Sequence, residues 1–265
     1  MSVLAPKGFV AAGVSAGIKP GEVLDVAVVA TDKPVPPAAG FTTNRAAAAP
    51  VRLSRIHGAS APTAKAVVLN SGCANAATGE RGKAVADLTA NRTAELLACS
   101  PEDVLVCSTG TVGPHLAPEA IPSGVVDAVG ALGDGEVTAL AAATAIMTTD
   151  SEPKEVTVEA DGFTVGGMAK GAGMVRPDMA TMLVVLTTDA EVAASVLDRA
   201  LRVAVDHSFH ALNVDGCPST NDTVIAMASG ASGFAPQPEP LAAALTRAAV
   251  ALARHIAADA EGATR

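Results

Sequence analysis

Aromatic residues are almost absent from this sequence of 265 residues, which has five Phe, no Tyr and no Trp. Proteins that bind single-stranded nucleic acid stack the bases on aromatic rings, and the net charge of -9 opposes contact with a phosphate backbone. We therefore expect no nucleic-acid partner. Because hydrophobic residues still make up 49% of the chain, the core must be packed from Ala, Val, Leu and Ile.

Long apolar runs and a secretory leader are also missing. No stretch of 18 uninterrupted apolar residues occurs, so we expect no membrane-spanning segment, and residues 1–13 lack the pattern of a signal peptide. The four cysteines, at positions 73, 99, 107 and 217, include no CxxC pair. This spacing favours reduced, buried thiols over disulfides or a zinc site. The expected compartment is the cytoplasm.

Short β-branched runs alternate irregularly with longer Ala/Leu-rich segments. Strands are expected at Lys65–Asn70, Asp103–Cys107 and Met182–Leu186, with a hairpin over Lys154–Val165. Helices are expected at Lys83–Leu97, Pro118–Leu132, Glu136–Met147, Ala193–Phe209 and Pro240–Ala258. This irregular order predicts an α/β or α+β fold with a mixed sheet, and the composition marks no domain boundary.

Four turns rich in Gly, Asn and Thr follow or precede the expected strands, at residues 70–75, 107–113, 170–181 and 215–222. Each turn alone is explained by backbone geometry, since Gly adopts positive φ at no steric cost. No Walker, GxGxxG, GxSxG or HExxH pattern is present. The pair His207 and His210 lacks an accompanying carboxylate motif, which favours a surface pair over a metal site.

The junction of Ala180 and Thr181 allows two interpretations. Thr at the start of a strand is ordinarily only a good β-former. The alternative is that Thr181 attacks its own preceding carbonyl and frees a new N-terminus. Its hydroxyl would then be a nucleophile and its α-amino group, with a pKa of roughly 7.7–8.0, a base near neutral pH. The residues alone favour the first interpretation.

The segment Lys170–Leu183, KGAGMVRPDMATML, closely resembles the self-cleavage motif of the ornithine acetyltransferase family, also called glutamate N-acetyltransferases. Other segments resemble signatures of the same family and occur in family order over nearly the whole chain. They are Phe41–Asn44, Ala49–Val51, Asn70–Asn75, Ser108–Gly110, Ala145–Asp150, Ser219–Asp222 and Asp259–Thr264.

The resemblance implies a fold and a division of the chain. The fold is the N-terminal-nucleophile-like layered αββα sandwich with mixed sheets. The precursor splits between Ala180 and Thr181 into an α chain, residues 1–180, and a β chain that begins with residues 181–265. Two α and two β chains would form a heterotetramer. Family members continue through an Asp-Pro-Asn-Trp-Gly-Arg motif that supplies further pocket residues, and this Trp-free sequence lacks it.

The resemblance also implies a reaction. Thr181 would accept the acetyl group of N2-acetylornithine as an ester and pass it to glutamate, a ping-pong transfer. Thr109 and Gly110 would form the oxyanion hole. Lys170 would bind the α-carboxylate that both substrates share.

Two further residues match substrate-binding positions of the family, namely Thr148 and Glu261. The residues alone leave simpler roles open, with Thr148 capping a turn, Lys170 exposed and Glu261 in a solvated tail. The resemblance implies no metal and no organic cofactor, and leaves acetyl-CoA open as a second acetyl donor. Two other functions stay open as well: an amide hydrolase or aminopeptidase on the same kind of scaffold, and an inactive truncated form.

Overall fold

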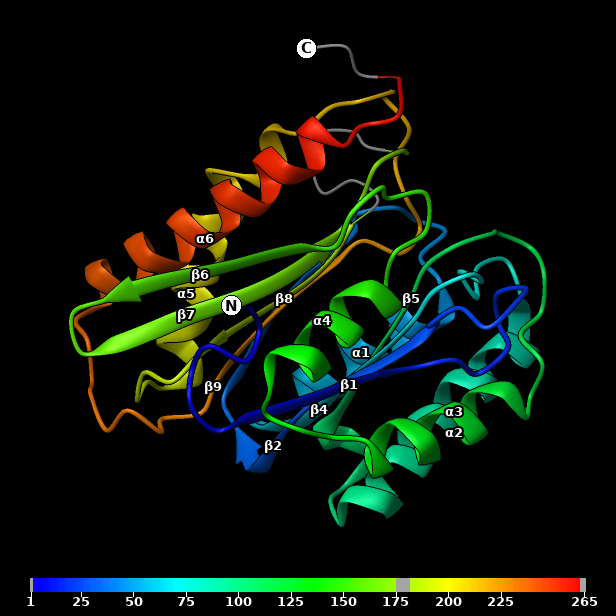
Figure 1. Cartoon of the computed structure of the whole chain (residues 1–265), viewed down its shortest axis with the longest axis horizontal. Helices are drawn as coiled ribbons and strands as arrows, with labels where there is room; N and C mark the ends of the chain where they lie inside the picture. The colour runs from blue at the N-terminus through cyan, green and yellow to red at the C-terminus, as the bar shows by residue number, and fades with distance from the viewer. Residues whose placement is uncertain (1, 175–181, 263–265) are drawn as a thin grey trace.

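Two β-sheets lie face to face at the centre of the protein (Figure 1). The computed structural model describes residues 2–174 and 182–262, so Ala180 and Thr181 lie outside the described residues. The first sheet has the strand order β1-β2-β4-β5 and consists of β1 (Phe9–Val14), β2 (Val26–Val35), β4 (Ala64–Asn70) and β5 (Val104–Ser108). The second has the order β3-β9-β8-β7-β6 and consists of β3 (Pro37–Phe41), β9 (Thr223–Ala228), β8 (Leu183–Thr188), β7 (Phe163–Lys170) and β6 (Lys154–Ala160).

Both sheets are mixed, because β4 pairs with β5 and β8 with β9 in parallel while the other pairs are antiparallel. Parallel neighbours end at the same edge of a sheet. The chain therefore leaves β4 at Asn70 and β5 at Ser108 side by side. This shared edge brings together two of the four turns noted in the sequence.

Helices cover the outer faces of the sandwich. The first sheet is covered by α2 (Gly79–Leu97) and α3 (Ala120–Gly130), with α1 (Ala49–Ser60) beside β5. The second sheet is covered by α5 (Ala194–Asp206) and α6 (Pro238–Ala258). The helix α4 (Glu136–Ala145) packs on β1, and two 3-10 turns lie at Pro101–Asp103 and Phe209–Ala211.

The core between the sheets is packed from small and aliphatic side chains, as the composition requires. Val29, Leu69 and Val185 are fully buried there with alanines of α4. Gly13 of β1 lets this helix approach closely, since a Cβ at that position would lie 2.1 Å from the carbonyl oxygen of Ala141. A sandwich of two mixed sheets between helical layers confirms the expected fold class.

Every helix and strand expected from the sequence is present, with its ends shifted by a few residues. Of the elements in the described residues, the four strands β1, β2, β3 and β9, the helix α1 and the two 3-10 turns are not among those expected. The two cysteines Cys73 and Cys107 are buried free thiols, as expected. The expectation of burial is wrong for Cys217, which is exposed on a Gly-Pro loop, and only partly right for Cys99.

The helix α6 is long and apolar enough, by length and composition, to cross a membrane, with a mean hydropathy of 1.3. Its apolar side is occupied within the fold. Leu241, Leu245, Leu252 and Ile256 are fully buried in the core under the second sheet, beside α5. In this structure α6 is a core helix.

Candidate active site

A cavity of about 620 Å³ lies where the turns after β4, β5 and β7 meet the loop before β9. It is lined by Lys19, Gly72, Ala74, Thr109, Gly110, Thr111, Val112, Thr148, Thr149, Lys170, Gly173, Met174, Asp215, Cys217, Ser219, Thr220, Asn221 and Glu261. All five predicted site residues that the structure describes are in this wall. The structure thus brings together residues that are up to 152 positions apart, from Thr109 to Glu261.

Gly110 lies where the turn after β5 meets the turn after β4. The backbone N–H of Thr109 donates to Asn70 O at 2.9 Å, and that of Thr111 donates to Gly72 O at 3.3 Å. Gly110 has a φ of +126°, and a Cβ there would lie 2.4 Å from the carbonyl carbon of Gly72. Within the described part of the chain its own N–H has no hydrogen-bond partner. With respect to the described residues, this N–H of a cavity-lining residue is available as a donor.

Asn221, just before β9, joins the second sheet to both of these turns. Its side-chain amide donates to Ala74 O at 2.6 Å and to Ser108 O at 2.9 Å, and it is buried. Ser108 in turn donates to Asn70 Oδ1 at 2.6 Å. Buried, satisfied polar networks of this kind rigidify a site.

Lys170, the last residue of β7, is only 2% exposed, which excludes the simpler role of a surface lysine. Its ammonium group donates to Thr109 Oγ1 at 3.3 Å. Burial lowers the pKa of Lys170, and the negative charge of Asp150 opposes that shift. Because the Thr109 oxygen accepts this bond, its own hydroxyl hydrogen stays available to a ligand.

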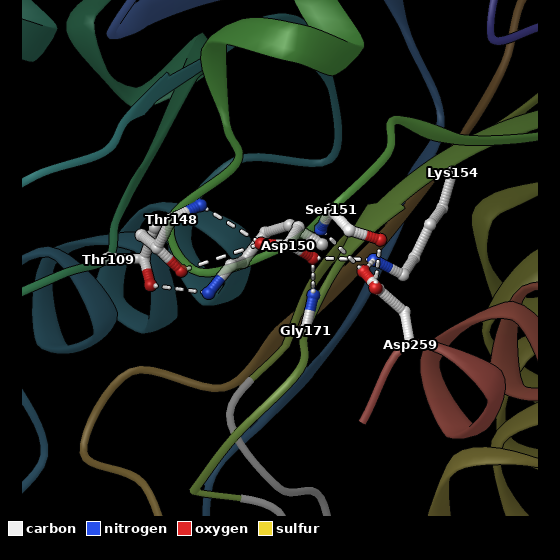
Figure 2. Close-up of polar contacts among 8 residues, drawn as sticks. Thr109, Thr148, Asp150, Ser151, Lys154, Gly171 and Asp259 are labelled. Carbon is white, nitrogen blue, oxygen red and sulfur yellow. Dashed lines mark hydrogen bonds and ion pairs between the residues drawn. The ribbon is translucent and has the colours of Figure 1, made fainter. Parts of the chain in front are cut away.

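Thr148 both lines the cavity and closes a tight turn. Its backbone N–H donates to Asp150 Oδ2 at 2.9 Å, and its hydroxyl lies 3.5 Å from the same oxygen (Figure 2). Asp150 is buried. Burial alone would raise the pKa of Asp150, but the charge of Lys170 and hydrogen bonds from Lys154, Thr148 and Gly171 hold it below its usual value.

Glu261 follows α6 and lines the cavity beside the segment that follows Lys170. Its backbone N–H donates to Ala172 O at 2.8 Å. Its carboxylate lies over Gly173, where a Cβ would come within 2.7–2.8 Å of the carboxylate atoms. Glu261 is exposed at the mouth of the cavity but is held there by backbone contacts, unlike a free tail residue.

Asp222 is a buried carboxyl group that the sequence analysis does not single out. Its Oδ1 accepts the backbone N–H of Met182, the residue after Thr181, at 3.1 Å. In the described part of the chain Oδ2 is buried without a hydrogen-bond partner. Burial raises the pKa of Asp222 to about 8, so this carboxyl group is largely protonated at neutral pH.

Lys19 is a second cation in the wall and is missed by the sequence analysis. Its ammonium group donates to Leu24 O at 2.9 Å and to Met147 O at 2.8 Å. Burial lowers its pKa. The fully buried Asp25 holds the loop in place by accepting the N–H groups of Ala16 and Ile18, each at 2.6 Å. The only local signal is the turn composition around Lys19, Gly-Ile-Lys-Pro, which does not specify a site.

Among residues 2–174 and 182–262, no group of three His, Cys, Asp or Glu side chains could hold a metal ion. His210 instead contacts Asp206, with 3.0 Å between Nδ1 and Oδ1. The described part of the cavity wall offers two cations, several hydroxyl groups, the carboxylates of Asp215 and Glu261, and the Gly110 N–H, which has no hydrogen-bond partner among the described residues. Such a set is chemically suited to a small molecule that carries both charges, and its donors are of the kind that can stabilise an oxyanion.

Two kinds of protein are among the solved structures whose overall fold is similar to that of this chain. An ornithine acetyltransferase of Mycobacterium tuberculosis, solved in complex with ornithine, is 42% identical and matches 69% of this chain and 96% of that chain with a TM-score of 0.64. An L-aminopeptidase D-Ala-esterase/amidase of Ochrobactrum anthropi, described as a variant of the Ntn hydrolase fold, is 15% identical with a TM-score of 0.57 over 98% of this chain and 86% of its own. The second likeness shows the fold alone.

Curated relatives match over the full length of the chain. The arginine biosynthesis bifunctional protein ArgJ of Bifidobacterium longum is 47% identical over 100% of this chain and 68% of its own length. That of Thermobifida fusca is 49% identical over 100% of this chain and 69% of its own length. The ArgJ family pattern matches residues 10–265. The family expected from the sequence motifs is therefore confirmed, and the chain belongs to the ArgJ family.

Proposed function

We propose that this protein is a glutamate N-acetyltransferase that moves the acetyl group of N2-acetylornithine to glutamate. The relatives are named as arginine-biosynthesis proteins, and one solved relative carries ornithine. The observation that carries the proposal is the convergence of Thr109, Gly110, Thr148, Lys170 and Glu261 on one cavity.

The nucleophile in this proposal is Thr181, freed by cleavage of its own peptide bond. Its hydroxyl oxygen bonds to the carbonyl carbon of Ala180, the C–N bond breaks as the nitrogen takes a proton, and water hydrolyses the resulting ester. The free α-amino group then acts as base. Support comes from the chain on either side, because Met174 lines the cavity and Met182 is bound by Asp222, the neighbour of Asn221 in the wall.

Acetyl transfer then takes two steps. The Thr181 oxygen bonds to the acetyl carbon of acetylornithine, and the oxyanion is stabilised by the Thr109 hydroxyl and the Gly110 N–H. The C–N bond breaks, ornithine leaves with the proton, and the acetyl group stays on Thr181 as an ester. The amine nitrogen of glutamate then bonds to the acetyl carbon, the C–O bond to Thr181 breaks, and the amine proton returns to the Thr181 oxygen, which completes a ping-pong cycle.

Charged groups in the wall match the charges of the substrates. The buried ammonium of Lys170 suits the α-carboxylate that acetylornithine and glutamate share, since ionised hydrogen bonds are the stronger kind. Lys19 adds a second positive charge. Glu261 suits an amine, and Thr148 offers a hydroxyl group.

The acetyl group arrives on the substrate, so the proposal uses no cofactor and no metal, and acetyl-CoA is an alternative donor to be tested. Residues 1–180 would form the α chain and residues 181–265 the β chain or its first part. Two such pairs would form a heterotetramer in the cytoplasm.

Intact mass and N-terminal sequencing test the first step. We expect two fragments, the second beginning Thr-Met-Leu-Val, and a single uncleaved chain for Thr181→Ala. Labelled acetylornithine with glutamate then tests the second step, and we expect labelled acetylglutamate. Release of labelled acetate with no acetylglutamate would replace the transferase by a hydrolase. Cleavage with neither product would refute the proposed activity for this chain.

A further inference from the structure

Lys154, at the start of β6, is an ion-pairing residue buried beside the candidate active site. Its ammonium group lies 2.8 Å from Asp150 Oδ1 and 2.5 Å from Asp259 Oδ2 (Figure 2). The Lys154 side chain has no exposed surface, and it is not part of the cavity wall. A buried ammonium between two carboxylates is costly to disrupt, because loss of one partner leaves an uncompensated charge. Lys154, Asp150 and Asp259 are called the ion cluster below.

Asp150, the first carboxylate of the ion cluster, holds two segments of the active site. Its Oδ1 accepts the backbone N–H of Gly171 at 2.6 Å, directly after Lys170. Its Oδ2 accepts the backbone N–H of Thr148 at 2.9 Å. Both hydrogen bonds are to backbone groups, so Asp150 fixes the path of the two loops (Figure 2).

Asp259, the second carboxylate, holds the end of α6. It accepts the backbone N–H of Ser151 at 2.9 Å and also the Ser151 hydroxyl. Burial alone would raise the pKa of Asp259, but Lys154 and Ser151 hold it below its usual value. Two residues later, Glu261 binds Ala172 O through its backbone. The segment after α6 is thus held by Ser151 at residue 259 and by Ala172 at residue 261.

We propose that the ion cluster is a positioning device that fixes Glu261 relative to Lys170 in the wall of the cavity. Lys154 joins the carboxylate beside Lys170 to the carboxylate beside Glu261, so the spacing of the two charged side chains depends on it. A substrate with an ammonium and a carboxylate needs that spacing to be constant, because a misplacement of about 1 Å moves the substrate out of the position in which it can react. This inference rests on the proposed function.

The first test is Asp259→Asn, which keeps the shape of the side chain and removes its charge. We expect the KM for acetylornithine to rise about tenfold while kcat changes less than about threefold, because the oxyanion hole is untouched. The matched control is Asp198→Asn, which removes the carboxylate of an exposed ion pair with Arg202. The control should leave both constants unchanged.

A double-mutant cycle separates positioning from a general loss of structure. If Asp259 acts through Glu261, then Asp259→Asn added to Glu261→Gln should raise KM by less than about twofold further. If the two effects multiply, the cluster does not act through Glu261 and the proposal is overturned.

Hydrogen exchange tests the same inference without turnover. The Glu261 amide is bonded to Ala172 O, and in Asp259→Asn it should exchange about tenfold faster while amides inside α6 are unchanged. Unchanged exchange at Glu261 would overturn the inference. Faster exchange in a protein that transfers no acetyl would retain the positioning role and reject the proposed function, so the two failures are distinguishable.

Discussion

The ammonium group of Lys170 donates a hydrogen bond to the hydroxyl oxygen of Thr109, at 3.3 Å. The two residues come from different sheets, since Thr109 follows β5 of the first and Lys170 ends β7 of the second. A positive charge on the oxygen side makes the Thr109 hydroxyl a stronger donor toward the cavity. The proposed oxyanion hole and the proposed carboxylate site are therefore one polar unit.

Removal of the Thr109 hydroxyl should slow the chemistry more than it weakens binding. If the hydroxyl acts on the developing oxyanion as proposed, Thr109→Ala should lower kcat by about 10²–10³ with a small change in KM. Thr109→Ser keeps the hydroxyl and should retain most of the rate. A loss in KM alone, measured in steady-state transfer assays, would assign Thr109 to substrate binding instead.

Gly110 should tolerate no side chain. Its φ of +126° is strained for any other residue, and a Cβ would overlap the backbone of Gly72. Gly113 is a matched control, because it has a φ of +101° but open space around it. We expect Gly113→Ala to cost about 1–3 kcal/mol and Gly110→Ala clearly more. Thermal unfolding measures both, and equal losses would mean that the contact with Gly72 relaxes freely.

Lys170 should impose an alkaline limit on activity. Its pKa is lowered by burial, so the charge that we propose binds the substrate carboxylate should be lost as pH rises through a range below the ordinary 10.4 or so. We expect kcat/KM to fall over that range in the natural protein. Lys170→Arg keeps its positive charge over that pH range. Its kcat/KM should therefore be lower than that of the natural protein but should not change with pH over the same range. The same alkaline fall in both proteins would assign the limit to another group.

Asp222 should make the protein less stable as pH rises. Its folded-state pKa is about 8, above the ordinary value of about 3.9, so the folded state binds the proton more tightly than the unfolded chain. The free energy of unfolding should therefore fall between about pH 4 and 8, by up to about 1.4 kcal/mol per pH unit from this group. Asp222→Asn should remove that slope in urea unfolding at pH 5.5 and 8.5. Parallel slopes would mean that Asp222 titrates normally.

Among the α-helices that the structure describes, local sequence patterns predict all except α1. In α5 the buried side chains Leu197, Leu201 and Val205 recur at helical spacing. The turn at Asp161–Gly162 likewise marks the hairpin of β6 and β7. The strand β2 is not among the expected strands, although its run Val26–Ala30 is as continuously buried as the predicted strand β8.

Some residues of the candidate site could likewise be predicted from the sequence, and others could not. Thr109, Lys170 and Glu261 follow from the resemblance of whole motifs to a family. Lys19 and Asp222 owe their roles to contacts with Met147 and Met182, far away in the sequence. No local pattern encodes such contacts, because they exist only after segments far apart in the sequence have folded together.

The strand order of the second sheet decides what a cut between Ala180 and Thr181 would produce. The strands after the cut, β8 and β9, lie between β7 and β3, which precede it. Two fragments would therefore share one continuous sheet and one core, without a separable interface. Their dissociation would require unfolding, so subunit exchange between cleaved molecules should be as slow as unfolding itself. After the cut, the two fragments would therefore still fold and unfold together as one unit.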